Sequence, residues 1–220
     1  MSVHSSLAKG ATMPVGGQPL LAQEPATAGE LLAEFIQRHP RLLILTGAGV
    51  STGSGIPDYR DGEGSWKRKQ PVQHGEFLSN LHARQRYWGR SLIGWPVIRN
   101  ARPNPAHFQI VELEKRGHCQ ALITQNVDRL HQKAGSLSAV DLHGRADEVI
   151  CMGCGERSTR DRMHKRCAQL NPGLERVTAT AGPDGDADLE LDFSGFQVAN
   201  CGHCGGVLKP DVVFFGDNVP

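Results

Sequence analysis

The chain has 220 residues, of which 39% are apolar, and its formal net charge is +1. This length allows one sizeable core with a small inserted module. The near-neutral charge gives no long-range electrostatic reason to expect a specific nucleic acid or an anionic membrane as a partner. No apolar run approaches the roughly 18 residues of a membrane span.

The first ordered element is expected after a tail. Residues 1–22 have neither the apolar block of a secretory signal nor the several arginines of a transit peptide, and we interpret them as a mobile tail. A T-x-x-E capping box at Thr27 and Glu30 then begins a helix, and Pro40 ends it. Residues 41–46, RLLILT, form an apolar run too short for a helix, as expected for a parallel strand covered on both faces.

The same alternation continues along the chain. Asn104 and Pro105 begin a second helix, which Gly117 ends. The runs CQALITQ, 119–125, and AVDLHG, 139–144, predict two further buried strands. Helices that alternate with buried strands indicate an α/β fold, a doubly wound parallel sheet of the Rossmann type.

Glycines and polar residues follow these strands in the runs TGAG, TQNVD and LHG. Ligands of such sheets bind at the carboxyl ends of the strands. Gly47 and Gly49 let the backbone approach a ligand, and Ser51 and Thr52 can donate hydrogen bonds to phosphate oxygens. Alone, this turn is a weak signal, because Thr52 stands where a G-x-G-x-x-G motif has its third glycine. A purely structural turn is an equally good interpretation of this stretch.

Four of the six cysteines form two Cys-x-x-Cys pairs, Cys151 with Cys154 and Cys201 with Cys204. Two such knuckles supply four thiolates to a closed, structural zinc site, which indicates a reducing compartment. His164, Cys167 and His203 are competing ligands that we expect to be bystanders. Cys119 is expected to be a small buried apolar residue. A ribbon that docks nucleic acid or protein is the alternative role of the module.

Five blocks together resemble the sirtuins, which are NAD-dependent protein-lysine deacylases. They are GAGVSTGSGIPDYR at 47–60, TQNVDRLH at 124–131, LHG at 142–144, the two cysteine pairs, and LKPDVVFFGD at 208–217. In order and spacing these blocks span residues 42–217. Tyr59, QHGEF at 73–77, RQRYW at 84–88 and the long gap between the cysteine pairs resemble the class II branch, that of the fourth mammalian sirtuin and its bacterial relatives.

The resemblance implies an acyl-transferring enzyme that uses NAD, moves the acyl group of acyl-lysine to ADP-ribose and releases nicotinamide. It implies His143 as general base, a role that suits an imidazole of ordinary pKa about 6.5. Asn126 would be the second catalytic residue and hold the nicotinamide ribose, while Asp128 would bind the carboxamide and Gln125 a ribose hydroxyl. The implied cofactor-binding residues are Gly47, Ala48, Gly49, Ser51, Thr52, Asp58, Tyr59, Arg60, Gln125, Asn126, Asp128 and His143, with residues 58–60 in a closing loop.

The resemblance also implies acylated proteins or peptides as partners, which would add a strand along VVFFGD. The implied contacts there are Val213, Phe214, Phe215 and Gly216, and a buried strand without a binding role is the alternative. Tyr87 and Arg90 have the Tyr-x-x-Arg spacing with which some sirtuins hold an acidic acyl chain, and on a helix they share a face. The competing interpretation is a core Tyr87 with a solvated Arg90.

The expected organisation is the tail at 1–22, the first Rossmann part at 23–70, a small helical module at 71–103, the second Rossmann part at 104–148, the zinc module at 149–206, and a return to the Rossmann domain at 207–220. Sirtuins continue beyond the last block, so the C-terminal strands of the sheet are expected to be missing here. Protein mono-ADP-ribosyl transfer in the same pocket and a catalytically impaired, zinc-stabilised binding module remain alternatives. We expect a monomer in a bacterial cytoplasm, or in the mitochondrial matrix if the source is eukaryotic.

Overall fold

A computed structural model describes residues 27–58, 72–177, 179, 187, 189 and 191–219. Tyr59, Arg60 and the tail expected at 1–22 lie outside the described residues. The chain divides into two compact units, Met1–Arg38 and His39–Pro220. Among the helices in the described ranges, none combines the length and the apolar character that crossing a membrane requires.

The first unit contributes helix α1, Ala28–Arg38. The backbone N–H and the hydroxyl of Thr27 donate to Glu30 Oε2 at 2.7 and 2.9 Å, and the Glu30 N–H donates to Thr27 Oγ1 at 3.3 Å. The predicted capping box is therefore confirmed. It satisfies backbone donors that the first turn of a helix otherwise leaves without partners.

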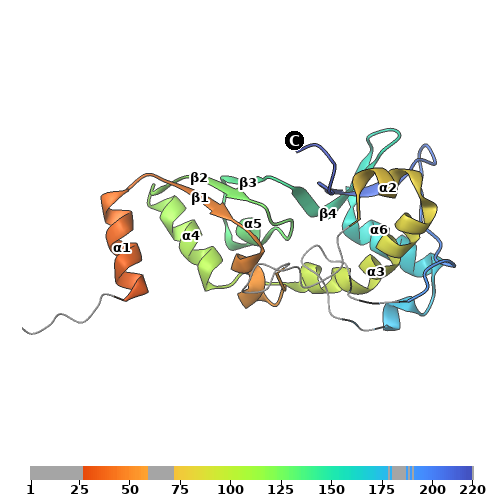
Figure 1. Ribbon diagram of the computed structural model, residues 1–220, viewed down its shortest axis with the longest axis horizontal. Helices are drawn as coiled ribbons and strands as arrows, with labels where there is room; N and C mark the ends of the chain where they lie inside the picture. Colours follow the sequence, from red (N-terminus) through yellow and green to blue (C-terminus); the bar gives the residue numbers. More distant parts are fainter. Residues whose placement is uncertain are drawn as a thin grey trace, which may run out of the picture. The chain divides into compact units, whose positions relative to one another are not determined.

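The second unit begins with a three-stranded parallel sheet, in which β1 (Leu42–Thr46), β2 (Cys119–Thr124) and β3 (Ala139–Asp141) lie side by side (Figure 1). Thr46 pairs with Thr124, and Thr124 pairs with Asp141. The three strands thus end level with one another, as the sequence predicts. The third strand is shorter than the run 139–144, because the Leu142 N–H bonds to the Thr124 carbonyl at 2.9 Å and the chain then turns away.

Helix α4 (Pro105–Lys115) lies against β2 and against the short helix α5 (Leu130–Ala134). The Asn104 side chain caps α4 by accepting from the Ala106 N–H at 2.9 Å. Leu43 and Leu45 remain 67% and 58% exposed, so the expectation that β1 is covered on both faces is wrong for the described structure. An apolar run reports the character of its side chains and does not say which neighbours cover them.

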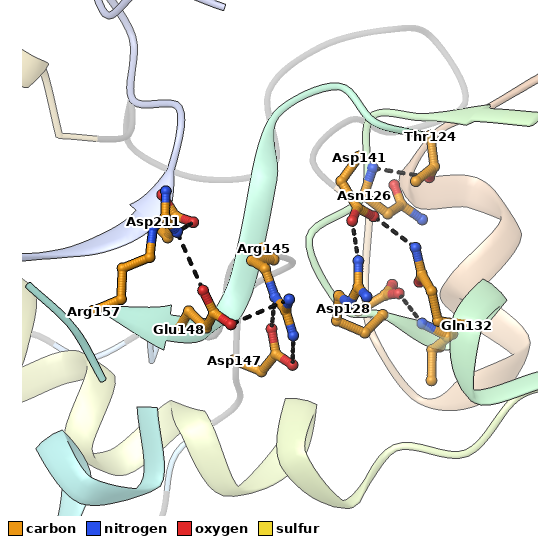
Figure 2. A network of polar contacts seen from close by, with 12 residues as sticks. Thr124, Asn126, Asp128, Gln132, Asp141, Arg145, Asp147, Glu148, Arg157 and Asp211 are labelled. Carbon is orange, nitrogen blue, oxygen red and sulfur yellow. Dashed lines mark hydrogen bonds and ion pairs between the residues drawn. The ribbon is translucent and has the colours of Figure 1, made fainter. Parts of the chain in front are cut away.

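A second, antiparallel sheet has the order β5-β4-β6. Its strands are β4 (Gly144–Cys151), β5 (Arg157–Thr159) and β6 (Leu208–Val212). Helix α6 (Arg160–Leu170) packs on β4, and two short 3₁₀ helices, η1 (Ala48–Ser54) and η2 (Leu174–Arg176), complete the unit. Ion pairs of Arg157 with Glu148 and Asp211 join the three strands (Figure 2). Strand β6 ends at Val212, which is the first residue of the run VVFFGD.

The main hydrophobic core lies beside this second sheet. Helices α2 (His74–Ser79) and α3 (Leu81–Asn100) fall in the range 71–103 where a helical module is expected. Trp88, Trp95 and Met163 are at most 4% exposed in a cluster that joins α3, α6, β4 and β6. The buried Arg160 guanidinium lies 4.6 Å from the Trp88 ring centroid, a cation–π contact that helps to compensate for the burial of its charge.

Candidate active site and metal centre

The polar segments that follow the three parallel strands are joined to one another. The Gln125 N–H donates to the Thr46 carbonyl at 2.9 Å. The Asn126 side-chain amide donates to the Gly47 carbonyl at 3.1 Å and to Ser51 Oγ at 3.0 Å. Residues that are about 75 positions apart in the sequence therefore form one cluster at one edge of the sheet, as is typical of ligand sites in α/β proteins.

Ser51 and Asp128 lie inside this cluster. Ser51 is fully buried and donates its hydroxyl to Asp128 Oδ2 at 2.7 Å, while Asp128 Oδ1 accepts from the Leu130 N–H at 2.8 Å. Figure 2 shows Asp128 with Asn126, Gln132 and Asp141 beside the end of β2. The structure thus gives Ser51 and Asp128 partners within the protein. A role of either group toward phosphate or carboxamide stays a prediction.

The surface of the glycine turn is open at Gly49. A Cβ atom built at Gly49 meets nothing within 4 Å, and the residue is exposed. Thr52 donates its hydroxyl to the Gly49 carbonyl at 3.0 Å, and the Val50 N–H donates to the Gly47 carbonyl at 3.0 Å. The donors that remain for an incoming anion are the first N–H groups of η1, which a helix start leaves without partners in the helix. Ala48 in the same turn and Asp58 further along the chain are both half-buried.

His143 follows β3 and is oriented by a backbone carbonyl. Its Nδ1 lies 3.1 Å from the Gln125 oxygen. Because a carbonyl oxygen only accepts, Nδ1 carries the hydrogen and Nε2 keeps the lone pair of a base. Gly144 is required next to it, since its φ is +77° and an added Cβ would lie 2.1 Å from the Asp211 oxygen.

The segment expected to bind substrate adjoins His143, whose carbonyl accepts from the Val213 N–H at 2.9 Å. Phe214 is buried with its ring centroid 5.2 Å from that of Tyr87, whereas Phe215 is 49% exposed. Gly216, with a φ of +80°, is exposed beside it. Tyr87 is 5% exposed among aromatic rings, and Arg90 Nε donates to the Ala187 carbonyl at 2.7 Å.

A buried lysine that the sequence does not single out holds the end of this segment. Lys209 is 4% exposed, and its Nζ lies 2.9 Å from Asp217 Oδ2. Burial raises the pKa of Asp217, but hydrogen bonding and attraction from Lys209 outweigh it and hold that pKa below its usual range. A lysine in a short apolar run gives no signal of its own, because its partner is supplied by the fold.

The two cysteine pairs converge. The four sulfur atoms of Cys151, Cys154, Cys201 and Cys204 all lie within 4.8 Å of one another. Backbone N–H groups of Gly153, His203 and Gly206 each donate to a sulfur at 3.4 Å. The Cys154 amide is the main cause that lowers the pKa of Cys151 to about 6, whereas the lowering effect of the Glu156 amide on Cys154 is outweighed by hydrogen bonds among the sulfurs, which raise the pKa of Cys154 to about 12. Cys151 is therefore the thiol that loses its proton first.

This donor set fits zinc. Four soft thiolates at the corners of a tetrahedron form a closed site, which is the structural type of zinc site. Among the described residues, His164, Cys167 and His203 do not belong to the group. Cys119 is 7% exposed in β2, as expected of a small buried apolar side chain. The cysteine cluster could therefore bind zinc.

A parallel sheet with a glycine turn and a hydrogen-bonded imidazole at its strand ends, together with four clustered thiols that could bind zinc, defines an α/β protein with a candidate ligand site and a candidate metal centre. Residues 47–220 match the Sir2 family, and the chain belongs to that family. The sirtuin resemblance expected from the sequence is thus confirmed.

Relatives and solved structures agree with this assignment. The chain is 56% identical to NAD-dependent protein deacetylase 2 of Bradyrhizobium diazoefficiens, over 88% of this chain and 71% of that protein. It is 47% identical to the mitochondrial NAD-dependent protein lipoamidase sirtuin-4 of Bos taurus, over 86% of this chain and 61% of that protein. A solved structure of Sir2 with a p53 peptide and NAD⁺ matches at a TM-score of 0.64 and 30% identity, over 88% of this chain and 67% of that one. The chain thus spans about two thirds of the length of these proteins.

Proposed function

We propose that this chain carries the site of an NAD-dependent protein-lysine deacylase, stabilised by one structural zinc ion. The observation that carries the proposal is that the neighbouring residues Gln125 and Asn126 contact both the His143 ring and the turn Gly47–Ser51 at one end of the sheet. Family membership and the relatives named NAD-dependent deacetylases support it. The bacterial relatives and the reduced thiol cluster support a bacterial cytoplasmic location.

NAD, when bound, supplies a ribose whose bond to nicotinamide breaks as the carbonyl oxygen of acyl-lysine bonds to the anomeric carbon. The proposed role of His143 is to accept, at Nε2, the proton of the ribose hydroxyl that then attacks the acyl carbon. The Gln125 carbonyl accepts from Nδ1–H and stabilises the imidazolium that results. Water completes the balance, and nicotinamide, free lysine and 2′-O-acyl-ADP-ribose are the products.

Two protein groups orient the reactants in this proposal. Asn126, whose side chain is fixed on Gly47 and Ser51, places the nicotinamide ribose, and the backbone N–H groups at the start of η1 hold the pyrophosphate. In this proposal the peptide lies beside the segment 213–216, next to the Val213–His143 hydrogen bond. The Phe215 carbonyl already accepts from the His74 N–H at 2.9 Å, so the peptide contacts there are made by the exposed Phe215 side chain and Gly216.

The test is His143→Tyr, assayed for nicotinamide release and acyl-ADP-ribose by mass spectrometry. We expect deacylation to be abolished with the melting temperature retained, whereas His82→Leu, an exposed histidine on α3, should leave turnover unchanged. Retained turnover in His143→Tyr would rule the base assignment out. Labelled NAD distinguishes ADP-ribosyl transfer, because that reaction leaves the label on the protein. If a calorimetric titration detects no binding of NAD, the binding-module alternative is favoured.

The acyl preference is a separate proposal. An acidic acyl chain held by Arg90 would compete with the hydrogen bond from Arg90 Nε to the Ala187 carbonyl. Tyr87 contacts Phe214, which belongs to the proposed peptide segment, and Arg90 follows Tyr87 by three residues on α3. Rates with acetyl, glutaryl and lipoyl peptides on wild type and Arg90→Met decide the question. A loss confined to the glutaryl peptide supports the acidic preference, and equal ratios throughout remove it.

A further inference from the structure

A buried polar layer lies directly behind the candidate site. Thr46 and Thr124, at the ends of β1 and β2, are 8% and 2% exposed. His131 on α5 is 1% exposed, and His107 on α4 is fully buried. Four polar side chains buried in such a place need hydrogen-bond partners, since burying an unpaired polar group is costly.

The hydrogen bonds fix which nitrogen of His131 carries its hydrogen. The Thr46 hydroxyl donates to Thr124 Oγ1 at 2.9 Å, and His131 Nε2 lies 2.9 Å from Thr46 Oγ1. A hydroxyl has a single hydrogen, and that of Thr46 is already used. His131 Nε2 is therefore the donor, and Nδ1 of the neutral ring keeps the lone pair.

His107 has the complementary arrangement. Its Nδ1 accepts from the Asn104 N–H at 3.3 Å, so its hydrogen is on Nε2. The two rings lie 4.8 Å apart between centroids. His107 Nε2 and His131 Nδ1, a donor and an acceptor, are both buried without a hydrogen-bond partner in the described structure. Burial lowers the pKa of both rings, that of His131 to about 4, so both are neutral near pH 7.

The layer reaches the site through Thr124, whose Oγ1 also accepts from the Asn126 backbone N–H at 3.1 Å. Figure 2 shows this contact between Thr124 and Asn126. The hydroxyl of Thr124 is oriented by Thr46, and that of Thr46 by His131. Asn126 in turn holds Gly47 and Ser51.

We propose that His131 is a positioning residue, whose Nε2–H orients the Thr46 and Thr124 hydroxyls and thereby fixes Asn126 against the glycine turn. The His107 ring, 4.8 Å away between centroids, packs against the His131 ring. The catalytic part of this inference rests on the proposed function, in which Asn126 places the nicotinamide ribose.

The hydrogen assignment is tested without any activity, by ¹⁵N NMR of the histidine rings in the full chain at pH 7. We expect His131 and His107 to be neutral with the hydrogen on Nε2, and we expect Thr46→Val to shift the His131 ring signals. A charged His131, or one with its hydrogen on Nδ1, overturns the proposal even if the protein proves not to be a deacylase.

The kinetic test compares His131→Leu, which removes the donor, with His131→Gln, whose terminal amide N–H can replace it. Because displacement of a positioned group by about 1 Å can cost up to about a hundredfold in rate, we expect kcat to fall at least tenfold in His131→Leu with little change in the peptide KM. His131→Gln should recover most of the loss. Thr46→Val should lower kcat similarly, and the double variant with His131→Leu should be no worse than either single variant.

A merely structural role has a different outcome. It lowers the melting temperature of His131→Leu while kcat per folded molecule, measured well below that temperature, stays at the wild-type value. This outcome, or additive losses in the double variant, contradicts the proposal. An inactive wild type with the expected NMR signals would instead contradict the proposed function and leave the hydrogen-bond assignment standing.

Discussion

The two sheets of the second unit differ in how they are held together. At the end of the parallel sheet, Ser51, Asp128 and Asn126 bond to one another, while Leu43 and Leu45 on β1 are exposed. The antiparallel sheet has the main apolar core and the four thiols. The difference teaches that the proposed site residues are fixed by polar contacts in a part with little apolar core of its own. We expect most of the apolar contribution to stability to come from the antiparallel part.

His143 and Gly144 connect these two parts. His143 is bound to Gln125 on the parallel side and to Val213 on the antiparallel side. We therefore expect a change in the antiparallel part to reach the proposed base through the backbone at Val213 and Gly144. Substitutions in one part, with stability and turnover measured for each variant, show how strongly the parallel and antiparallel parts are coupled.

The largest effect is expected from Cys154→Ser. Removing one of four thiolates weakens a metal site whose binding energy is about 10 kcal/mol or more in small zinc domains. We expect bound zinc to fall from one ion per chain to none, with loss of the cooperative melting transition of the core. Metal analysis and calorimetry measure this. The control variant Cys119→Ala, with its change in the parallel sheet, should still contain one zinc ion per chain. An unchanged zinc content in Cys154→Ser would contradict the assignment of the four thiols as zinc ligands.

A smaller effect is expected from Gly144→Ala. The left-handed φ of +77° costs about 1–2 kcal/mol for a residue with a Cβ, and the contact of 2.1 Å with the Asp211 oxygen adds to this. Gly117→Ala is the matched control, because Gly117 has the same φ of +77° and nothing within 4 Å. Denaturant titration should show a greater loss for Gly144→Ala, and only this variant should lose turnover. Equal losses would mean that the Asp211 contact is unimportant.

Much of this arrangement could be predicted from the sequence. Apolar runs ending in glycine or polar residues located β1 and β2, and Asn104-Pro105 marked the start of α4. Two Cys-x-x-Cys pairs were enough to predict one four-thiol centre, because the spacing itself makes the knuckle. In each case the signal is local, within one element or one turn.

The remaining features depend on contacts between distant segments. The hydrogen bond of Ser51 with Asp128 joins residues 77 positions apart, and neither sequence context reveals that both are buried. An extended strand was one interpretation of residues 212–217, but the strand lies at Leu208–Val212. Of the two aromatic residues that suggested it, Phe214 packs against Phe77 and Tyr87, and Phe215 is exposed. His131 was quoted in a motif, but its burial depends on α4.

The pH dependence of stability gives the next smaller effect. In the unfolded chain His131 binds a proton near pH 6.5, whereas in the folded chain its pKa is lowered to about 4. Between these values the unfolded state holds more protons, so the free energy of unfolding falls as the pH falls, and above about 6.5 it is constant. At pH 5 the titration of His131 lowers the free energy of unfolding by at most about 2 kcal/mol relative to its value above pH 6.5.

Urea titrations at pH 7.5 and pH 5 measure this effect. His131→Gln cannot titrate, so its stability should fall less than that of the wild type between the two pH values. His82→Leu, which removes an exposed histidine, should follow the wild type. A variant His131→Gln with the same acid loss as the wild type would show that this ring is not held neutral.

The smallest effect on stability, about zero, is expected from Gly49→Ala. This substitution therefore tests ligand binding at the carboxyl end of the parallel sheet without a change in stability. A Cβ at Gly49 meets nothing within 4 Å, so the fold accommodates it. A dinucleotide whose pyrophosphate approaches the backbone there would meet the added methyl group, and we expect the KM for NAD to rise about tenfold with an unchanged melting temperature. Gly202→Ala, also without neighbours within 4 Å but next to the thiol cluster, should change neither quantity. An unchanged KM in Gly49→Ala would contradict the assignment of the glycine turn as a phosphate-binding surface, because the added Cβ has no protein atom within 4 Å to displace.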